Sequence, residues 1–332
     1  MKAAVLHKPQ AVASGPLHIE DIPVPDIKPG HVLLEVRACG VCRTDLHIVE
    51  GELQPKLPAV IPGHQIVGTV AANGTGSDFA TGTRVGVSWL GGTDGTCEYC
   101  RRQLENLCDN PTFTGYSING GYAEYSLVRS DFVFPLPGAL DDLHAAPLLC
   151  AGIIGYRSLR VAGVEHGDRV GLFGFGASAH LAISLLHAWG CNVYVSTRGE
   201  SHRHLAAELG AKWVGSENEK PPVQLDRAIT FAPSGAVVVS ALASIRKGGV
   251  VAINAIHLDR IPEFDYDTLL WGERQLRSVA NMTRTDAREF LQTASDIGLR
   301  PKVKAVGLAD INDALRELKA DKVDGAIAIL PR

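Results

Sequence analysis

The sequence predicts an α/β protein with two domains, a mainly β domain and a doubly wound parallel sheet. The length of 332 residues exceeds what one hydrophobic core usually organises, so two domains are expected. The pattern also changes near residue 152, from short β-rich runs broken by Gly and Pro to strands that alternate with helices. Such alternation is typical of a parallel sheet covered by helices on both faces.

The first part of the chain, residues 1–151, has the pattern of antiparallel strands joined by long loops. Its clearest strands are β-rich runs bounded by Gly or Pro, and these are residues 32–36, 65–70 and 122–128. We expect the loops of this domain to carry its functional residues.

Residues 152–280 are expected to form the parallel-sheet domain. Its predicted strands are 168–173, 192–195, 226–230 and 250–253, with one helix at 177–189 and another that ends at 209–210. Residues 281–332 contain an amphipathic helix at 311–318 and a strand at 326–330, which we expect to return to the first domain.

The charge and cysteine content exclude several classes of protein. Lys and Arg number 32 against 36 Asp and Glu, a net charge of −4, which argues against a nucleic-acid or anionic-membrane partner. No apolar run has the length of a membrane span, and the first residues lack the apolar segment of a signal peptide. Seven cysteines at metal-like spacing favour a reducing compartment, so we expect a cytoplasmic protein.

A glycine-rich turn follows the predicted strand at 168–173 and opens the next helix. In the sequence GFGASA, Gly174 permits a tight turn, Gly176 allows a close approach to a pyrophosphate, and Ala179 is small enough for helix–strand packing. The helix that starts at Ala177 offers free N–H groups to phosphates. This pattern predicts a dinucleotide site of the Rossmann type.

The end of the second strand of this domain bears on the choice of cofactor. NAD sites usually place an acidic residue there to bind the ribose hydroxyls, whereas this chain has Ser196, Thr197 and Arg198. Small hydroxyls beside an arginine suit a 2′-phosphate. We therefore favour NADP(H), with NAD(H) as the alternative.

Cys42, His64 and Cys150 are candidate ligands of a catalytic zinc. Each stands in a loop or at the end of an element, from which it can be aimed inward. Two thiolates and one imidazole leave the fourth tetrahedral position open, which is typical of a catalytic rather than a structural zinc. Each residue alone also fits a packing role, but beside a nucleotide-binding pattern the combination favours a metal site.

A second cluster of cysteines indicates a structural zinc. Cys97, Cys100 and Cys108 lie within a Gly-rich stretch, and Asp94 precedes Cys97 by three residues. A carboxylate oxygen is an accepted zinc ligand, although it is harder than a thiolate and is expected to retain zinc less firmly. The alternative is three reduced thiols without a metal.

These motifs resemble those of zinc-dependent alcohol dehydrogenases of the medium-chain dehydrogenase/reductase superfamily, over essentially the whole chain. The matching segments are residues 40–47 (GVCRTDLH), 62–64 (PGH), 97–100 (CEYC), 105–108 (ENLC), 120–125 (GGYAEY), 149–152 (LCAG) and the turn at 174–179. The resemblance implies a GroES-like catalytic domain over 1–151 with both zinc sites, and a Rossmann coenzyme domain over 152–280. It also implies reversible hydride transfer between an alcohol and NAD(P), in a homodimer or homotetramer.

The resemblance also implies roles for residues near the first zinc ligand. Asp45 would orient His64, Thr44 would hydrogen-bond the substrate oxygen, and His47 would end a proton relay. Arg43 would contact the cofactor pyrophosphate.

The resemblance places Trp89 in the alcohol pocket, and Leu53 is a second candidate for its lining. Such a pocket suits an apolar primary, secondary or aromatic alcohol or its aldehyde or ketone, and the local pattern resembles the cinnamyl and benzyl alcohol dehydrogenase branch. The alternatives are a polyol dehydrogenase, a zinc-free quinone or enone reductase, and a non-catalytic nucleotide- or zinc-binding protein. Cys150 argues against a polyol dehydrogenase, and Cys42, His64 and Cys150 together argue against a zinc-free reductase. Thr44, Asp45 and His47 argue against a non-catalytic protein.

The chain departs from the family pattern at Asp94 and at two further positions. Gln65 stands where an acid usually follows the histidine ligand, and Ala326 stands where many relatives carry an arginine. A neutral residue at position 65 leaves the surroundings of the metal less negative, which is expected to make a bound zinc more electrophilic.

Overall fold

The computed structural model describes all 332 residues and divides them into two compact units. Residues 1–150 and 281–332 form the first unit, and residues 151–280 form the second. None of the helices combines the length and apolar character needed to cross a membrane.

The first unit is built on a mainly antiparallel sheet of seven strands. Its strand order is β16-β17-β3-β4-β5-β9, and β8 also pairs with β3. A two-stranded sheet of β1 and β2 and another of β6 and β7 complete the β structure. The strands are β1 (Lys2–Leu6), β2 (Leu17–Asp21), β3 (His31–Val41), β4 (Gln65–Asn73), β5 (Arg84–Val87), β6 (Leu90–Gly92), β7 (Thr112–Phe113), β8 (Tyr125–Arg129), β9 (Val133–Pro135), β16 (Val303–Gly307) and β17 (Ala326–Leu330).

The end of the chain joins the first sheet, because β17 pairs with β3 in antiparallel and with β16 in parallel. The helices of this unit are α1 (Arg43–Glu50), α2 (Glu98–Arg101), α3 (Asp142–Pro147), α9 (Arg284–Asp296) and α10 (Ile311–Lys319). Buried residues of β1, β3, β4, α1, α10 and β17 form one hydrophobic core. Helix α1 is therefore anchored in this core, which fixes the loop that carries Cys42.

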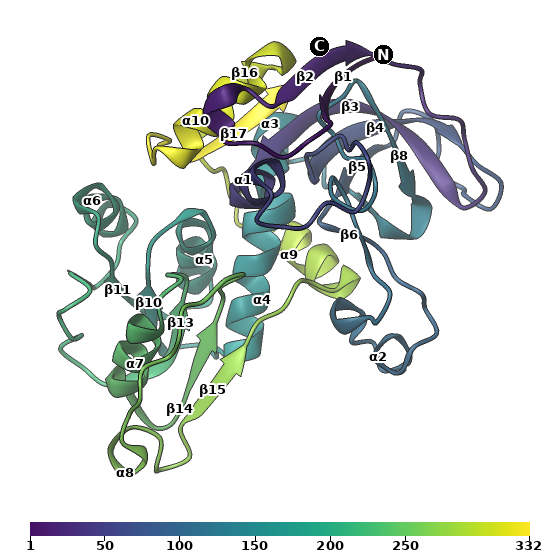
Figure 1. Ribbon diagram of the computed structural model, residues 1–332. Coiled ribbons are helices and arrows are strands. Elements are labelled where there is room, and N and C mark those ends of the chain that lie inside the picture. The colour runs from purple at the N-terminus through teal and green to yellow at the C-terminus, as the bar shows by residue number, and fades with distance from the viewer. The chain divides into compact units, whose positions relative to one another are not determined.

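The second unit contains a six-stranded sheet in which all neighbouring strands are parallel (Figure 1). Its order is β12-β11-β10-β13-β14-β15, so the chain runs outward from β10 in one direction and then from β13 in the other. This is the order of a doubly wound dinucleotide-binding sheet, with its switch point between β10 and β13. The strands are β10 (Arg169–Phe173), β11 (Asn192–Ser196), β12 (Trp213–Gly215), β13 (Leu225–Thr230), β14 (Ile245–Ile253) and β15 (Gln275–Ser278).

The helices that accompany this sheet are α4 (Ile153–Ala162), α5 (Ala177–Ala188), α6 (Glu200–Glu208), α7 (Gly235–Ser244) and α8 (Tyr266–Leu269). The fold class predicted from the sequence is confirmed by the two sheets. One strand boundary was wrong: the strand expected from residue 122 begins at Tyr125, because Tyr122 turns toward β1 and its carbonyl accepts the Ala4 N–H at 2.8 Å.

Candidate functional site

Cys42, His64 and Cys150 converge in the first unit. Cys42 lies between β3 and α1, His64 directly precedes β4, and Cys150 lies in a short π-helical turn after α3. Their ligand atoms all lie within 4.8 Å of one another, and Cys42 Sγ is 3.3 Å from His64 Nε2. Segments far apart in the sequence thus place two sulfurs and one nitrogen where a single cation can contact all three.

The surroundings of this trio raise the pKa values of His64 and Cys42. Burial lowers the pKa of His64, but the Cys42 thiolate and the Asp45 carboxylate outweigh burial and raise the pKa to about 10. The hydrogen bond with Cys150, together with burial, raises the pKa of the Cys42 thiol well above its ordinary value. Two half-buried thiols beside one buried carboxylate do not readily ionise together without a cation that compensates their charge, and two sulfurs with one imidazole nitrogen are ligands that Zn²⁺ prefers.

Asp45 is fully buried and ties the first two ligands together. Its carboxylate accepts the Cys42 N–H at 2.9 Å and the Gly63 N–H at 3.3 Å. Its Oδ1 also lies 3.3 Å from His64 Nδ1, which leaves His64 Nε2 facing Cys42. The carboxylate is therefore placed to set the orientation of the imidazole, as carboxylates do beside metal-binding histidines.

The other residues predicted on α1 occupy its first two turns. Thr44 is buried, and His47 Nδ1 lies 2.5 Å from Glu52 Oε2. Arg43 is exposed and forms an ion pair with Asp321, in the segment after α10. Sequence reasoning missed Glu52, although an acidic residue just after the helix that carries His47 was a usable signal.

A cluster of aromatic rings adjoins the three candidate ligands Cys42, His64 and Cys150. The Trp89 and His64 rings pack edge to face, with 5.2 Å between their centroids. Phe113 and Tyr116 stack on Trp89 at 4.9 and 5.9 Å, with interplanar angles of 19° and 17°. Leu53 packs against the same core as Trp89 and Tyr116. Phe113 and Tyr116 were missed because no motif in the sequence links them to Trp89.

Gln65 directly follows the candidate ligand His64 and is fully buried at the start of β4. Its Nε2 has no hydrogen-bond partner, and its side chain packs on Gly40, where a Cβ would come within 2.9 Å of Gln65 Cδ. The glycine at position 40 thus makes room for this side chain next to the loop that carries Cys42. The residue at position 65 contributes no charge to the site.

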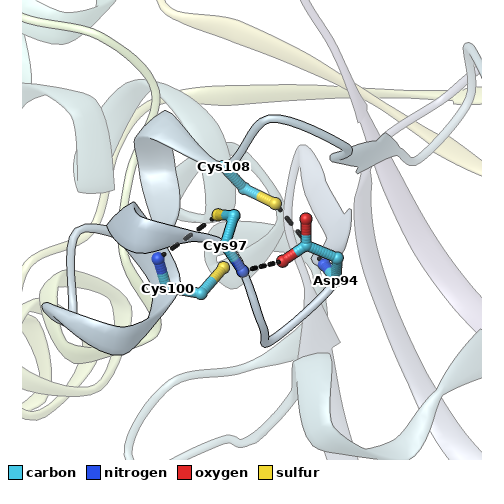
Figure 2. Close-up of side chains that lie close together, drawn as sticks. All are labelled: Asp94, Cys97, Cys100 and Cys108. Carbon is cyan, nitrogen blue, oxygen red and sulfur yellow. Dashed lines mark hydrogen bonds between the residues drawn. The ribbon is translucent and has the colours of Figure 1, made fainter.

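Asp94, Cys97, Cys100 and Cys108 form a second cluster of candidate ligands, again within 4.8 Å of one another. Figure 2 shows the three sulfurs and the carboxylate gathered around one point. The Asp94 N–H donates to Cys108 Sγ at 3.4 Å, and the Cys100 N–H donates to Cys97 Sγ at 3.5 Å. Three sulfurs and one carboxylate match the four-ligand set of a closed structural zinc site.

The Asp94 carboxylate also accepts several hydrogen bonds within this loop. Its Oδ1 accepts the N–H groups of Cys97 and Thr96, and its Oδ2 accepts from the Asn110 amide at 3.1 Å. These donors hold the pKa of the Asp94 carboxyl well below its usual range. Partial burial, with hydrogen bonds shared with Cys97 and Cys108, raises the pKa of Cys100 to about 12.

In the second unit, the glycine turn has the geometry of a phosphate-binding turn. Gly174 has φ +88°, and a Cβ there would come within 2.8 Å of the Ala232 nitrogen, so only glycine fits. Gly176 immediately precedes α5, which begins at Ala177, and a Cβ at Gly176 would meet no atom within 4 Å. Open space beside the N-terminus of a twelve-residue helix suits a pyrophosphate.

The segment after β11 carries the three residues predicted to select the cofactor. Ser196 and Thr197 are buried, and the Ser196 hydroxyl donates to the Ser216 carbonyl at 3.0 Å. The Arg198 side chain is 80% exposed, and Glu217 forms an ion pair with it at 3.6 Å. The arginine is therefore accessible at the strand end where a ribose phosphate would lie.

The fold and the two metal-ligand clusters define a class of protein, the two-domain zinc-binding dehydrogenases. Residues 28–138 match the family model described as "Alcohol dehydrogenase GroES-like domain", and residues 179–296 match "Zinc-binding dehydrogenase". The chain is 44% identical to the "probable alcohol dehydrogenase AdhA" of Mycobacterium tuberculosis, over 99% of this chain and 97% of that one.

Two further relatives agree with this match. An alcohol dehydrogenase of Geobacillus stearothermophilus is 35% identical over 99% of each chain. A solved cinnamyl alcohol dehydrogenase of Sorghum bicolor superposes with a TM-score of 0.87 at 26% identity, covering 98% of this chain and 97% of that one. The chain therefore belongs to the alcohol dehydrogenase family of medium-chain dehydrogenases, as the sequence motifs indicated.

Proposed function

We propose that this protein is a zinc-dependent alcohol dehydrogenase that transfers hydride reversibly between an alcohol and NADP(H). The convergence of Cys42, His64 and Cys150 in a member of this family is the observation that carries the proposal. In the oxidative direction, the alcohol gives a hydride to NADP⁺ and a proton to solvent, and an aldehyde or ketone results.

Cys42, His64 and Cys150 would hold the catalytic zinc, which acts as a Lewis acid that lowers the pKa of an alcohol. Thr44, on the first turn of α1, would accept the proton of the substrate hydroxyl while its own hydroxyl proton passes to the cofactor ribose, and His47 would take the proton from the ribose and release it to solvent. Asp45 keeps the His64 imidazole in one orientation throughout. Thr44, Asp45 and His47 all belong to α1, which keeps their spacing constant.

The proposed substrate is an apolar primary, secondary or aromatic alcohol. Trp89 lies against the histidine ligand, and Phe113 and Tyr116 extend its surface as nearly parallel rings. Leu53 packs against the same hydrophobic core as Trp89 and Tyr116 and would add an aliphatic side chain to the pocket. Flat aromatic surfaces bind ring-bearing alcohols by stacking and by excluding water, whereas a polyol would lose hydrogen bonds there.

The proposed cofactor is NADP(H), bound by the second unit. Gly174, Gly176 and Ala177 would receive the pyrophosphate, and Ser196, Thr197 and Arg198 would receive the ribose phosphate. The absence of an acidic residue at the end of β11 and the accessible Arg198 guanidinium support this assignment over NAD(H). Arg43 would add a charge to the pyrophosphate, in exchange for its ion pair with Asp321.

Asp94, Cys97, Cys100 and Cys108 would hold a second, structural zinc, and the first unit would thus carry both metals as the catalytic domain. Thiolate ligands remain reduced in the cytoplasm, which supports a cytoplasmic location.

We further propose a homodimer or homotetramer in which a second copy covers the β15 edge of the second unit. That strand ends the sheet, and Trp271 and Tyr266 nearby are 62% and 55% exposed.

The test is turnover by the purified, zinc-loaded protein. Primary, secondary and aromatic alcohols are supplied with NADP⁺ or NAD⁺, and the absorbance of the reduced nicotinamide is followed. Oxidation of an apolar alcohol with NADP⁺ supports the proposal. The absence of turnover with every alcohol and both cofactors would instead point to a binding protein that has kept the fold.

A further inference from the structure

The loop after α1, residues 51–57, is joined by a hydrogen bond from one tyrosine, its tether, to a part of the first unit that is distant in the sequence. The Tyr116 hydroxyl donates a hydrogen bond to the Gln54 carbonyl at 2.7 Å, although 62 residues separate the two positions. The Tyr116 ring is at the same time stacked on Trp89, beside the histidine ligand. One side chain thus connects the loop to the aromatic cluster of the candidate active site.

This loop supports His47 at two points. Glu52 places a carboxylate oxygen 2.5 Å from His47 Nδ1, and the Leu53 N–H donates to the His47 carbonyl at 3.1 Å. Gln54 follows directly, so the tether holds the chain two residues from Glu52. A shift of Gln54 would therefore move the carboxylate that contacts His47.

Leu53 and Leu57 of this loop pack against the hydrophobic core of the first unit. A hollow of about 20 Å³ lies beneath the loop, lined mainly by apolar groups, among them Ile48, Leu53, Leu57, Val60 and Tyr116. Glu52, Gln54, Pro55 and Lys56 are all exposed, and Pro55 and Lys56 also line this hollow. The loop is thus held by apolar contacts at Leu53 and Leu57 and, at the exposed Gln54, by the hydrogen bond from Tyr116.

We propose that Tyr116 is a positioning residue of the active site, which acts on His47 through Gln54 and Glu52. This inference rests on the function proposed above. Tyr116 does not touch the reacting atoms. Stacking on Trp89 fixes the Tyr116 ring, and the hydrogen bond from its hydroxyl fixes the Gln54 carbonyl. The Glu52 carboxylate, two residues earlier, is thereby kept against the His47 ring.

The proposal is tested by a double-mutant cycle with Tyr116→Phe and Glu52→Ala. The phenylalanine keeps the stacked ring and removes only the tether. Each single variant should lower kcat for an alcohol by about three- to tenfold, the effect of one lost hydrogen bond. The double variant should be no slower than the slower single variant, because an untethered loop no longer holds Glu52 against His47.

A matched control removes another tyrosine hydroxyl from the same unit. Tyr125 accepts a hydrogen bond from Arg332 at 3.0 Å on an exposed face, so Tyr125→Phe should leave kcat unchanged. Amide hydrogen exchange in residues 51–57 gives a second reading that needs no turnover. It should be faster in Tyr116→Phe than in the wild-type protein and unchanged in Tyr125→Phe.

Two results would overturn the proposal: unchanged exchange in the loop of Tyr116→Phe, or rate losses that multiply in the double variant. An inactive wild-type protein would contradict the proposed function and, with it, the effect on catalysis. The exchange measurement would then still decide whether Tyr116 tethers the loop, so the two failures are distinguishable.

Discussion

At the scale of single residues, the site depends on charges that are buried and compensated. Asp45 and His64 are both fully buried, and the carboxylate contacts the ring nitrogen opposite the one that faces Cys42. A carboxylate in this position fixes the ring and makes the facing nitrogen a better ligand. We therefore propose that Asp45 supports metal binding at His64 without being a ligand itself.

The variant Asp45→Asn tests this role. The amide oxygen of the variant side chain can still accept the hydrogen bond from the Cys42 N–H, but the negative charge beside His64 Nδ1 is lost. The zinc affinity of the catalytic site should therefore fall by about 10- to 100-fold. Competition with a chromogenic chelator measures the change. Asp313→Asn, on the exposed side of α10, is the control, and an equal affinity in all three proteins would show that Asp45 does not support the metal.

At the scale of elements, two short segments differ clearly from the usual pattern of zinc lobes and NAD sites. The loop that contains Asp94 uses a carboxylate both as a candidate ligand and as an acceptor of backbone N–H groups. The end of β11 presents an arginine where NAD sites carry an acid. Each segment allows a prediction that is independent of the catalytic trio.

Zinc retention in the second cluster should depend on the residue at position 94. Asp94→Ala should lose the second zinc to a mild chelator at once, whereas Asp94→Cys should retain it longer than the wild-type protein, because thiolates bind zinc more firmly than carboxylates. Metal content per chain against time measures this. Identical loss from all three proteins would mean that position 94 is not a ligand.

The pH dependence of this loop follows from the lowered pKa of Asp94. A carboxylate whose pKa is lower in the folded state stabilises the fold above its unfolded pKa of about 3.9, and that contribution is lost as the pH falls through the lower folded value. The hydrogen bonds of Asp94 should therefore persist throughout the neutral and mildly acidic range.

Arg198→Ala tests the choice of cofactor. Loss of a charged contact to the 2′-phosphate should raise the KM for NADP⁺ by about 10- to 100-fold and leave the KM for NAD⁺ nearly unchanged. Arg203→Ala is a useful comparison, because that guanidinium donates to the Thr197 and Arg198 carbonyls and supports the segment from within. Equal changes for both cofactors in Arg198→Ala would contradict an NADP-specific contact.

At the scale of the whole molecule, motifs made the fold class and the three candidate zinc ligands predictable. Cys42, His64 and Cys150 belong to short patterns with a distinctive chemistry, so they could be named before any coordinates. Phe113 and Tyr116 could not, because their stacking on Trp89 arises only when separate loops of the chain meet. Glu52 lies just after the helix that carries His47, so its contact with His47 was within reach of the sequence. The three-residue strand β12 was too short to give a pattern, whereas α9 was overlooked although Thr283 and Asp286 form a capping box at its start.

The exposed face around β15 leads to a prediction about assembly. Trp271→Ser should shift the protein toward monomers by removing a large apolar side chain from the proposed contact with a second copy. Light scattering over a range of concentrations reports the mass. A wild-type protein that is monomeric at every concentration would contradict the proposed oligomer.

The zinc dependence of the proposed alcohol dehydrogenase is tested by measuring alcohol oxidation in one preparation before and after its zinc is removed. We predict that the zinc-loaded protein reduces NADP⁺ with an apolar alcohol, that chelation abolishes turnover, and that added Zn²⁺ restores it. Cys150→Ser should remain nearly inactive under all three conditions while still binding the cofactor. Turnover that survives complete loss of zinc, or that is unaffected in Cys150→Ser, would contradict the account.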